Sequence, residues 1–263
     1  MLQPLNLCSF LLRKPVCDVK GNYLKVGFWI GLVIVTISLA SCGRSRIEQF
    51  PPDVILSRSA ERMISLAGFE FLIERSGQPV YLDYEETIAF RRAEGRFVSP
   101  DRVFTNVRII TPGLVAEVQI ISISGVQWET NLLTGAWQPT DPLYSFNPSL
   151  LFNSEKGIPV VLAHDLIAPE LRGMEELQEI PGKTLYAIQA TMQGESAYQM
   201  TYGMIDNDPL QVEVWIDPSS YDLYRFVLID PANSVDKEDT TWQIDFWNFG
   251  HISEIESPIP AIP

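Results

Sequence analysis

Few side chains in this sequence could do covalent, acid–base or metal chemistry. Apart from scattered carboxylates they are Cys8, Cys17, Cys42, His164 and His251. The histidines lie far from any cysteine, so a tetrahedral zinc set is not visible. The sequence contains no Gly-x-Ser-x-Gly nucleophile elbow, P-loop or GxGxxG motif. Asp206-Asn207-Asp208 lacks EF-hand spacing and favours a turn. These patterns predict a protein that is not an enzyme and that needs no cofactor or metal.

The thiol of Cys42 is the exception, because of what precedes it. Leu39-Ala40-Ser41-Cys42 closes an uncharged, mainly apolar run at residues 26–39, and Lys20 and Lys25 precede that run. This order is typical of a secretory leader with a small-residue cleavage site. It resembles the lipobox of bacterial lipoproteins, which implies that the Cys42 thiol receives a diacylglyceryl group and becomes the first mature residue.

A retained membrane anchor is the alternative interpretation of the same run. Fourteen helical residues at about 1.5 Å each span roughly 21 Å, short of a hydrocarbon core of about 30 Å. We therefore favour a lipoprotein signal peptide at residues 1–41, a lipid-anchored linker at 42–52 and a single domain at 53–263. The protein would then sit on the extracytoplasmic side of the cell membrane.

The charge is strongly negative and becomes more so when the leader is removed. The full chain carries 19 Lys plus Arg, 33 Asp plus Glu and a net charge of −14. Residues 1–41 contain four of the cations and one of the anions, so the remainder has a net charge of about −17. Phosphate binding needs a basic face, so nucleic acid is excluded as a partner. The mature part retains one cysteine, Cys42, and therefore has no disulfide framework.

One helix is predicted near the start of the mature chain, at residues 53–67. Asp53 is in position for an N-cap, and Gly68 follows as a helix stop. The helical spacing of Leu56, Ala60, Met63 and Ile64 predicts the stripe that packs on the rest of the domain.

The pattern then changes to alternation with a period of two. About nine strands are predicted, at residues 69–74, 88–91, 103–109, 116–120, 126–131, 186–190, 212–216, 224–228 and 242–246. Single-face alternation is typical of an antiparallel sheet with one wet and one apolar face, and the apolar face must be covered. The fold class is therefore α+β, with helices over one face of the sheet.

The middle of the chain, residues 134–170, breaks this pattern with five prolines. We interpret it as one or two short helices joined by loops, with residues 149–163 as a candidate lid. A further helix is expected at residues 195–204 and a turn at residues 217–220.

Several short motifs, in order, resemble the LppX_LprAFG lipoprotein family. Gly68-Phe69-Glu70-Phe71 is similar to the family's Ser-Phe-His-Phe, and Ser99-Pro100-Asp101-Arg102 looks like its Pro-Asp turn. The insert Asn147 to Phe152, the hairpin Ile180 to Tyr186, Val214-Trp215-Ile216-Asp217 and Phe246 to Gly250 also resemble family segments. Together they span nearly the whole mature chain.

The resemblance implies a curved antiparallel half-barrel like the LolA and LolB carriers, with helices over its concave face and a hydrophobic cavity for acylated lipid or glycolipid. It also implies transport across the envelope, with a membrane transporter as a further partner. The inward-facing candidates for the cavity wall are Phe71, Ile73, Phe90, Val118, Ile120, Tyr186, Ile188, Val214 and Phe226. The alternative is a structural or protein-interaction lipoprotein whose interior is filled.

Overall fold

A single antiparallel sheet of eleven strands dominates the computed structural model, which describes residues 50–140, 146–201, 203–205, 208–232 and 238–258. The leader and Cys42 lie outside these residues, so their processing stays a prediction. The strands are β1 (Gly68–Ser76), β2 (Ala89–Val98), β3 (Arg102–Thr111), β4 (Leu114–Ile123), β5 (Val126–Thr130), β6 (Trp137–Thr140), β7 (Leu166–Glu176), β8 (Thr184–Met192), β9 (Leu210–Ile216), β10 (Leu223–Asp230) and β11 (Thr240–Trp247).

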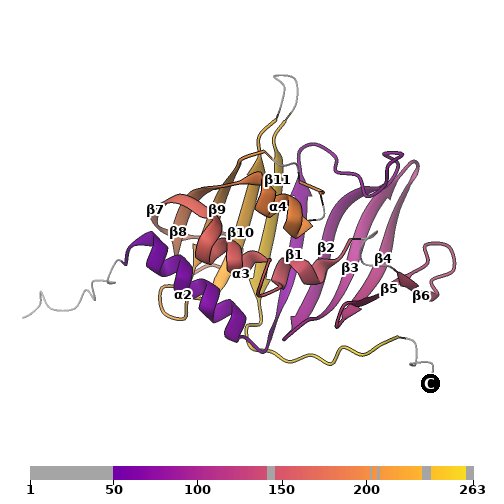
Figure 1. The fold of residues 1–263 in the computed structure, drawn as a ribbon, viewed down its shortest axis with the longest axis horizontal. Coiled ribbons are helices and arrows are strands. Elements are labelled where there is room, and N and C mark those ends of the chain that lie inside the picture. The colour runs from indigo at the N-terminus through magenta and orange to yellow at the C-terminus, as the bar shows by residue number, and fades with distance from the viewer. Residues whose placement is uncertain (1–49, 141–145, 202, 206–207, 233–237, 259–263) are drawn as a thin grey trace, which may run out of the picture. The chain divides into compact units, whose positions relative to one another are not determined.

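The order across the sheet is β6-β5-β4-β3-β2-β1-β11-β10-β9-β8-β7. The chain therefore winds outward from the centre to one edge, crosses to the other edge, and winds back until β11 pairs with β1 (Figure 1). The two edge strands do not pair with each other, so the curved sheet stays open. This confirms the α+β half-barrel that the alternation and the family resemblance predicted.

The alternation of β3 shows why one face of the sheet is inside. Val103, Thr105, Val107 and Ile109 are buried by 97% or more, whereas Asn106 and Arg108 between them are exposed. A shift of one residue in pairing would move this whole set to water. The pairing of Val107 with Val118 and of Thr105 with Ile120 keeps the apolar residues of β3 and β4 on the same face.

Helix α2 (Pro52–Ser65) lies along the covered face near β7 (Figure 1). Its N-cap is Pro51, so the prediction that Asp53 caps the helix is wrong; Asp53 lies in the first turn, where its charge favours the helix dipole. Met63 is buried as predicted, together with Ile55, Leu56, Ser59 and Ala60. Ile64 is 52% exposed, because it lies just outside the buried stripe.

Gly68 starts β1 and does not cap the helix, which already ends at Ser65. A Cβ on Gly68 would lie 2.5 Å from the carbonyl oxygen of His251 and 2.7 Å from that of Phe97. Only glycine permits this approach of three backbone segments at the end of the sheet.

The insert between the two halves of the sheet forms three short helical turns, η1 (Pro148–Phe152), α3 (Ile158–Val160) and η2 (Val161–Asp165). Helix α4 (Gly194–Thr201) lies beside it and is shorter than the expected 195–204. The Phe152 ring packs 4.6 Å from that of Phe71 and 5.1 Å from that of Phe69. The apolar residues of the insert thus pack in the core over the centre of the sheet, while residues 154–156 are exposed. The role of residues 149–163 as a lid stays a prediction.

Strands β6 and β7 were not predicted, since residues 134–170 were expected to be helices and loops. Pro139 sits in β6, and Pro169 sits in β7 beside a register shift. Ala168 has a φ of 49° and Gly173 a φ of 143°. Prolines and bulges are tolerated on edge strands, and both strands are edges, so their sequences lack clear alternation.

Within the described ranges, no helix combines the length and the hydrophobicity that crossing a membrane requires.

Candidate functional site

A cavity of about 460 Å³ lies over the β3–β6 half of the sheet. Its floor consists of alternating residues from β3 and β4, and its sides come from the β1–β2 loop, β5, the β5–β6 turn and β6. Its lining residues are Leu82, Ile88, Val107, Ile109, Val118, Ile120, Glu129, Thr130, Asn131, Leu132, Leu133, Gln138, Thr140 and Phe146. The two meander turns that join β3 to β4 and β5 to β6 bring these segments together.

The lining is apolar in the middle and polar along one side. Gln138 Nε2 donates to Glu129 Oε1 at 3.4 Å, and Thr130 Oγ1 accepts the backbone N–H of Gln119. The Asn131 amide oxygen accepts the N–H groups of Leu133 and Thr134 and so shapes the β5–β6 turn. Thr140 Oγ1 is buried without a hydrogen-bond partner. Among the described lining residues, Glu129 is the one acidic residue, and none is Lys, Arg or His.

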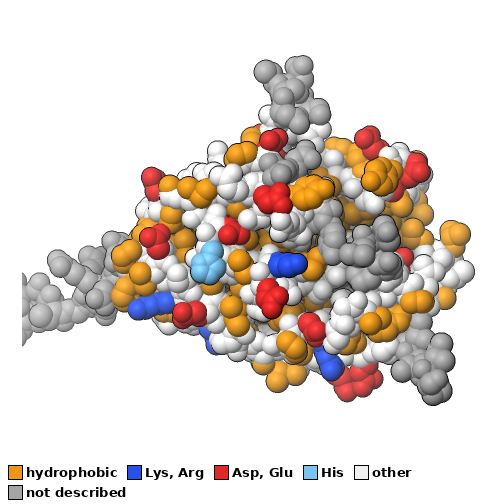
Figure 2. Space-filling model, in the orientation of Figure 1, with side chains coloured by type: hydrophobic (Ala, Val, Ile, Leu, Met, Phe, Trp, Pro, Cys, Tyr) orange, Lys and Arg blue, Asp and Glu red, His pale blue; other side chains and the backbone are white. Residues whose placement is uncertain are grey.

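Two exposed leucines flank the cavity. Leu132 is 46% and Leu133 95% exposed, and both line the cavity from the turn between β5 and β6. Exposed large apolar side chains cost free energy in water unless they meet a partner. Figure 2 shows hydrophobic side chains distributed over this end of the face, in the region of β3–β6.

The structure places the predicted wall residues on one face but in two settings. Val118 and Ile120 line the cavity. The other seven, Phe71, Ile73, Phe90, Tyr186, Ile188, Val214 and Phe226, are at most 2% exposed and pack in the main core. Over this part of the sheet the insert and the helices supply the contacts, as Phe152 does for Phe71. Ligand contact by the nine residues stays a prediction.

Sequence reasoning missed several cavity residues. Val107 and Ile109 were on the correct strand face but were not selected. Leu132-Leu133 next to Asn131 was a usable signal, since an apolar pair in a polar turn is unusual. Phe146 gave no signal, because it precedes η1 without periodicity.

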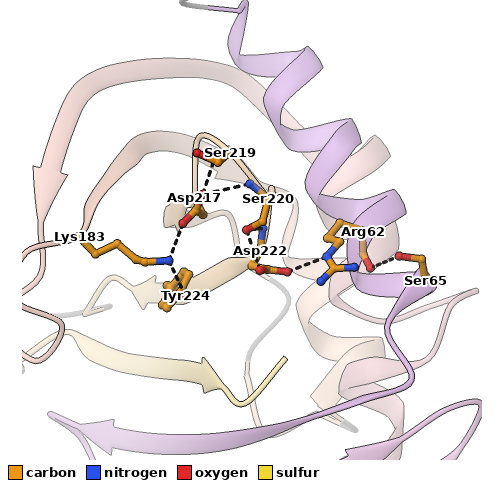
Figure 3. Close-up of polar contacts among 8 residues, drawn as sticks. All are labelled: Arg62, Ser65, Lys183, Asp217, Ser219, Ser220, Asp222 and Tyr224. Atoms are coloured by element: carbon orange, nitrogen blue, oxygen red, sulfur yellow. Dashed lines mark hydrogen bonds and ion pairs between the residues drawn. The ribbon is translucent and has the colours of Figure 1, made fainter. Parts of the chain in front are cut away.

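A polar cluster at the β9–β10 turn links strands β8, β9 and β10 in the other half of the sheet (Figure 3). Lys183 Nζ donates to Asp217 Oδ2 at 2.6 Å and to the Tyr224 hydroxyl at 2.7 Å. Asp217 Oδ1 accepts the N–H groups of Ser219 and Ser220, which confirms the predicted turn at residues 217–220.

The electrostatics of this cluster favour its ionised form. Burial opposes charge on Asp217, yet the hydrogen bonds from Lys183 and from two backbone N–H groups outweigh it, and the pKa of Asp217 is lowered. Burial likewise opposes charge on Lys183, but the bonds to Asp217 and Tyr224 raise its pKa.

The same turn also fixes α2. Asp222 Oδ1 accepts a hydrogen bond of 2.7 Å from Arg62 Nε, and its other oxygen accepts one from Ser220 Oγ. Arg58 donates to the Tyr221 hydroxyl at 2.6 Å. These contacts tie the helix to the strand turn, so we interpret the cluster as structural.

A second hollow, of about 470 Å³, lies near the end of β10 and is lined by four carboxylates, Glu86, Asp208, Asp230 and Glu238. Over the residues that the structure describes, no group of three or more His, Cys, Asp or Glu side chains is placed to hold a metal ion. His164 and His251 are both exposed.

The LppX_LprAFG lipoprotein family model matches residues 51–252, the span that holds the sheet, the insert and the cavity. The chain belongs to this family. No curated protein sequence matches it significantly.

Solved structures show the same fold at low sequence identity. LprF from Mycobacterium bovis superposes with a TM-score of 0.61 at 14% identity, covering 79% of this chain and 96% of LprF. The Mycobacterium tuberculosis lipoprotein LppX gives a TM-score of 0.54 at 12% identity, covering 78% and 97%. A LolA superfamily protein, NE2245 from Nitrosomonas europaea, aligns over 79% of this chain and 96% of its own at 10% identity, with a TM-score of 0.26, which is below the level that indicates a shared fold.

Proposed function

We propose that this LppX_LprAFG member is an envelope lipoprotein that binds one acyl chain of a lipid or glycolipid in the β3–β6 cavity and helps carry that lipid between envelope layers. The diacylglyceryl group on Cys42 tethers it to the extracytoplasmic side of the membrane. In this proposal the protein is a carrier and not an enzyme, and a membrane transporter is a further partner.

The cavity is the observation that carries the proposal. Its volume of about 460 Å³ falls in the range of roughly 300–1,000 Å³ that is common for small-molecule sites. Its floor residues Val107, Ile109, Val118 and Ile120 are aliphatic. An acyl chain there exchanges water for apolar contact, at about 0.8 kcal/mol per buried methylene.

The polar side of the cavity favours an uncharged headgroup that carries hydroxyls. Glu129, Thr130, Gln138 and Thr140 offer acceptors and donors, and the described lining contains no Lys or Arg. A phosphorylated headgroup would meet the Glu129 carboxylate without a compensating cation. A neutral glycolipid fits this chemistry better than an anionic phospholipid.

A structural or protein-interaction lipoprotein remains the second candidate, and the packing around Phe152 favours it. The Phe152 ring lies within 5.5 Å of the rings of Phe69, Phe71 and Phe97, so the centre of the interior is filled. The two proposals therefore differ on whether the β3–β6 cavity holds a lipid.

Mass spectrometry of organic extracts from the purified protein distinguishes them. We expect a non-covalent lipid, at up to one equivalent, with a neutral hydroxylated headgroup. Lipid attached to Cys42 stays on the protein during extraction and does not confuse the result. An extract without lipid, together with no uptake of added glycolipid or fatty acid, would favour the structural alternative.

A further inference from the structure

The aromatic side chain of Phe146 separates the cavity from a second, smaller void deeper in the domain. That void measures about 10 Å³ and lies between the sheet, η1 and α4, where Leu151, Thr201 and Trp242 line it. Among the described residues, Phe146 is the one that lines both spaces.

Phe146 is held by its backbone and by one ring contact. Its carbonyl oxygen accepts a hydrogen bond of 3.1 Å from Gln127 Nε2. The following residue, Asn147, caps η1 by accepting the N–H of Ser149 at 3.1 Å. The side chain itself is only half-buried and packs on the Phe90 ring, with 5.4 Å between centroids. Its backbone is thus fixed, while the ring supplies the wall.

Beyond this wall lies an unusual buried donor. Trp242 is 3% exposed, and its indole Nε1 has no hydrogen-bond partner, although a buried Trp N–H ordinarily finds one. The Trp242 ring also packs 5.2 Å from Phe90. Phe90 therefore contacts both the Phe146 ring that forms the wall and the Trp242 ring behind it.

From this arrangement we infer that Phe146 sets the length of acyl chain that the cavity accepts. The inference rests on the proposed function. A chain that enters over β3 and β4 ends against the Phe146 ring. Removal of the ring joins the two spaces and lets a longer chain reach Trp242. Each additional methylene that becomes buried raises affinity about fourfold.

A competition experiment tests this on the full-length protein purified from membranes. The protein is incubated with an equimolar mixture of saturated monoacylglycerols, whose headgroup is uncharged and hydroxylated, with chains of ten to twenty-two carbons, and the bound lipids are quantified by mass spectrometry. For Phe146→Ala we expect the preferred chain to be longer than for wild type, by about two carbons or more. The matched control is Phe104→Ala, which removes the same atoms beside the Arg96 guanidinium, away from the cavity lining.

Fluorescence gives a second measurement that depends on position. A long-chain monoacylglycerol brominated at the terminal carbon of its acyl chain should quench Trp242 in Phe146→Ala but not in wild type, and Trp242→Phe should remove the difference. If Phe146→Ala does not fold by circular dichroism, Phe146→Leu decides, with a smaller lengthening expected.

The outcomes separate the two proposals. Binding by wild type and variant with the same preferred length overturns the role of Phe146 and leaves the lipid-binding proposal intact. No monoacylglycerol bound by either protein contradicts lipid binding itself, and with it this inference. A longer preference in Phe104→Ala would also overturn the inference, because the effect would then not be local.

Discussion

The Lys183–Asp217 pair joins the β7–β8 hairpin to the β9–β10 turn through single side chains. The Asp217 side chain is 10% exposed and that of Lys183 36% exposed, so the pair is neither free in water nor deeply buried. A half-exposed pair of this kind stabilises less than a buried hydrogen bond to a charged group. Its main structural effect is to fix the β7–β8 turn relative to the β9–β10 turn.

We predict that Lys183→Met lowers the free energy of unfolding by roughly 1–2 kcal/mol at neutral pH. The lowered pKa of Asp217 means that its contribution is present above about pH 3.9 and is lost as pH falls through its folded-state value. The raised pKa of Lys183 means that its contribution is present below about pH 10.4 and is lost as pH rises further.

Urea unfolding of the two proteins across this pH range measures the effect. The difference between wild type and Lys183→Met should be flat near neutrality and shrink at both extremes. Lys156→Met, at an exposed position of the insert, is the control and should change little. A difference that persists below the folded-state pKa of Asp217 would contradict this account.

Cys42 is the residue on which the proposed localisation depends. We predict that Cys42→Ala abolishes both cleavage of the leader at this site and incorporation of labelled fatty acid. Two acyl chains are needed for stable anchoring, and a diacylglyceryl group supplies them. A variant that still incorporates label and matures normally would disprove the lipobox interpretation.

Among the elements, α2 shows how a sequence pattern and a fold agree. Its apolar stripe predicted the buried positions Leu56, Ala60 and Met63, and these are 2%, 2% and 6% exposed. The pattern could not predict whether Ile64 is buried, because Ile64 lies at the edge of the apolar stripe. The positions of α3, η2 and β7, which pack on α2, determine which residues at that edge are covered.

We predict that Met63→Asp costs about 3–5 kcal/mol of stability, because it places an unpaired charge in the core. Ile64→Asp on the same helix is the matched control and should cost less than 1 kcal/mol at its exposed position. Thermal or urea unfolding of both variants measures this. Equal losses would mean that α2 is not packed as described.

The sequence pattern likewise predicted some strands and missed others. Alternation located the strands of the sheet interior, such as β3 and β11, where each residue either faces the core or faces water. It could not locate β6 and β7, since edge strands tolerate Pro139, Pro169 and bulges that erase the pattern.

At the scale of the whole domain, the sequence predicted an apolar face of the sheet. It did not predict which part of that face packs against other protein residues and which part lines the cavity. Six predicted wall residues pack against protein, Ile73 borders the small inner void, and Val118 and Ile120 face the cavity. Alternation is the same in both cases, because it records only which side of the sheet a residue is on. The difference comes from residues such as Phe152 and Leu151, far away in sequence, that fill the space over one part of the sheet.

We predict that Val118→Trp fills the cavity and reduces bound lipid at least tenfold, while the melting temperature changes little. Val115→Trp is the control, because Val115 lies on the same strand, faces the other side and is 59% exposed. Lipid that co-purifies with each protein is measured by mass spectrometry. If Val118→Trp folds and retains as much lipid as wild type, the β3–β6 cavity is not the binding site.

The seam between β1 and β11 has a consequence for the order in which the chain becomes structured. Glu70 and Trp247, paired across this seam, also share a hydrogen bond from the Trp247 indole N–H to Glu70 Oε2, spanning 177 positions of sequence. During synthesis the amino-terminal meander can form from local hairpins, but the β1 edge must wait for the final strand. A chain that stops before β11 would leave two unprotected strand edges at the middle of the sheet, and such edges invite pairing between molecules.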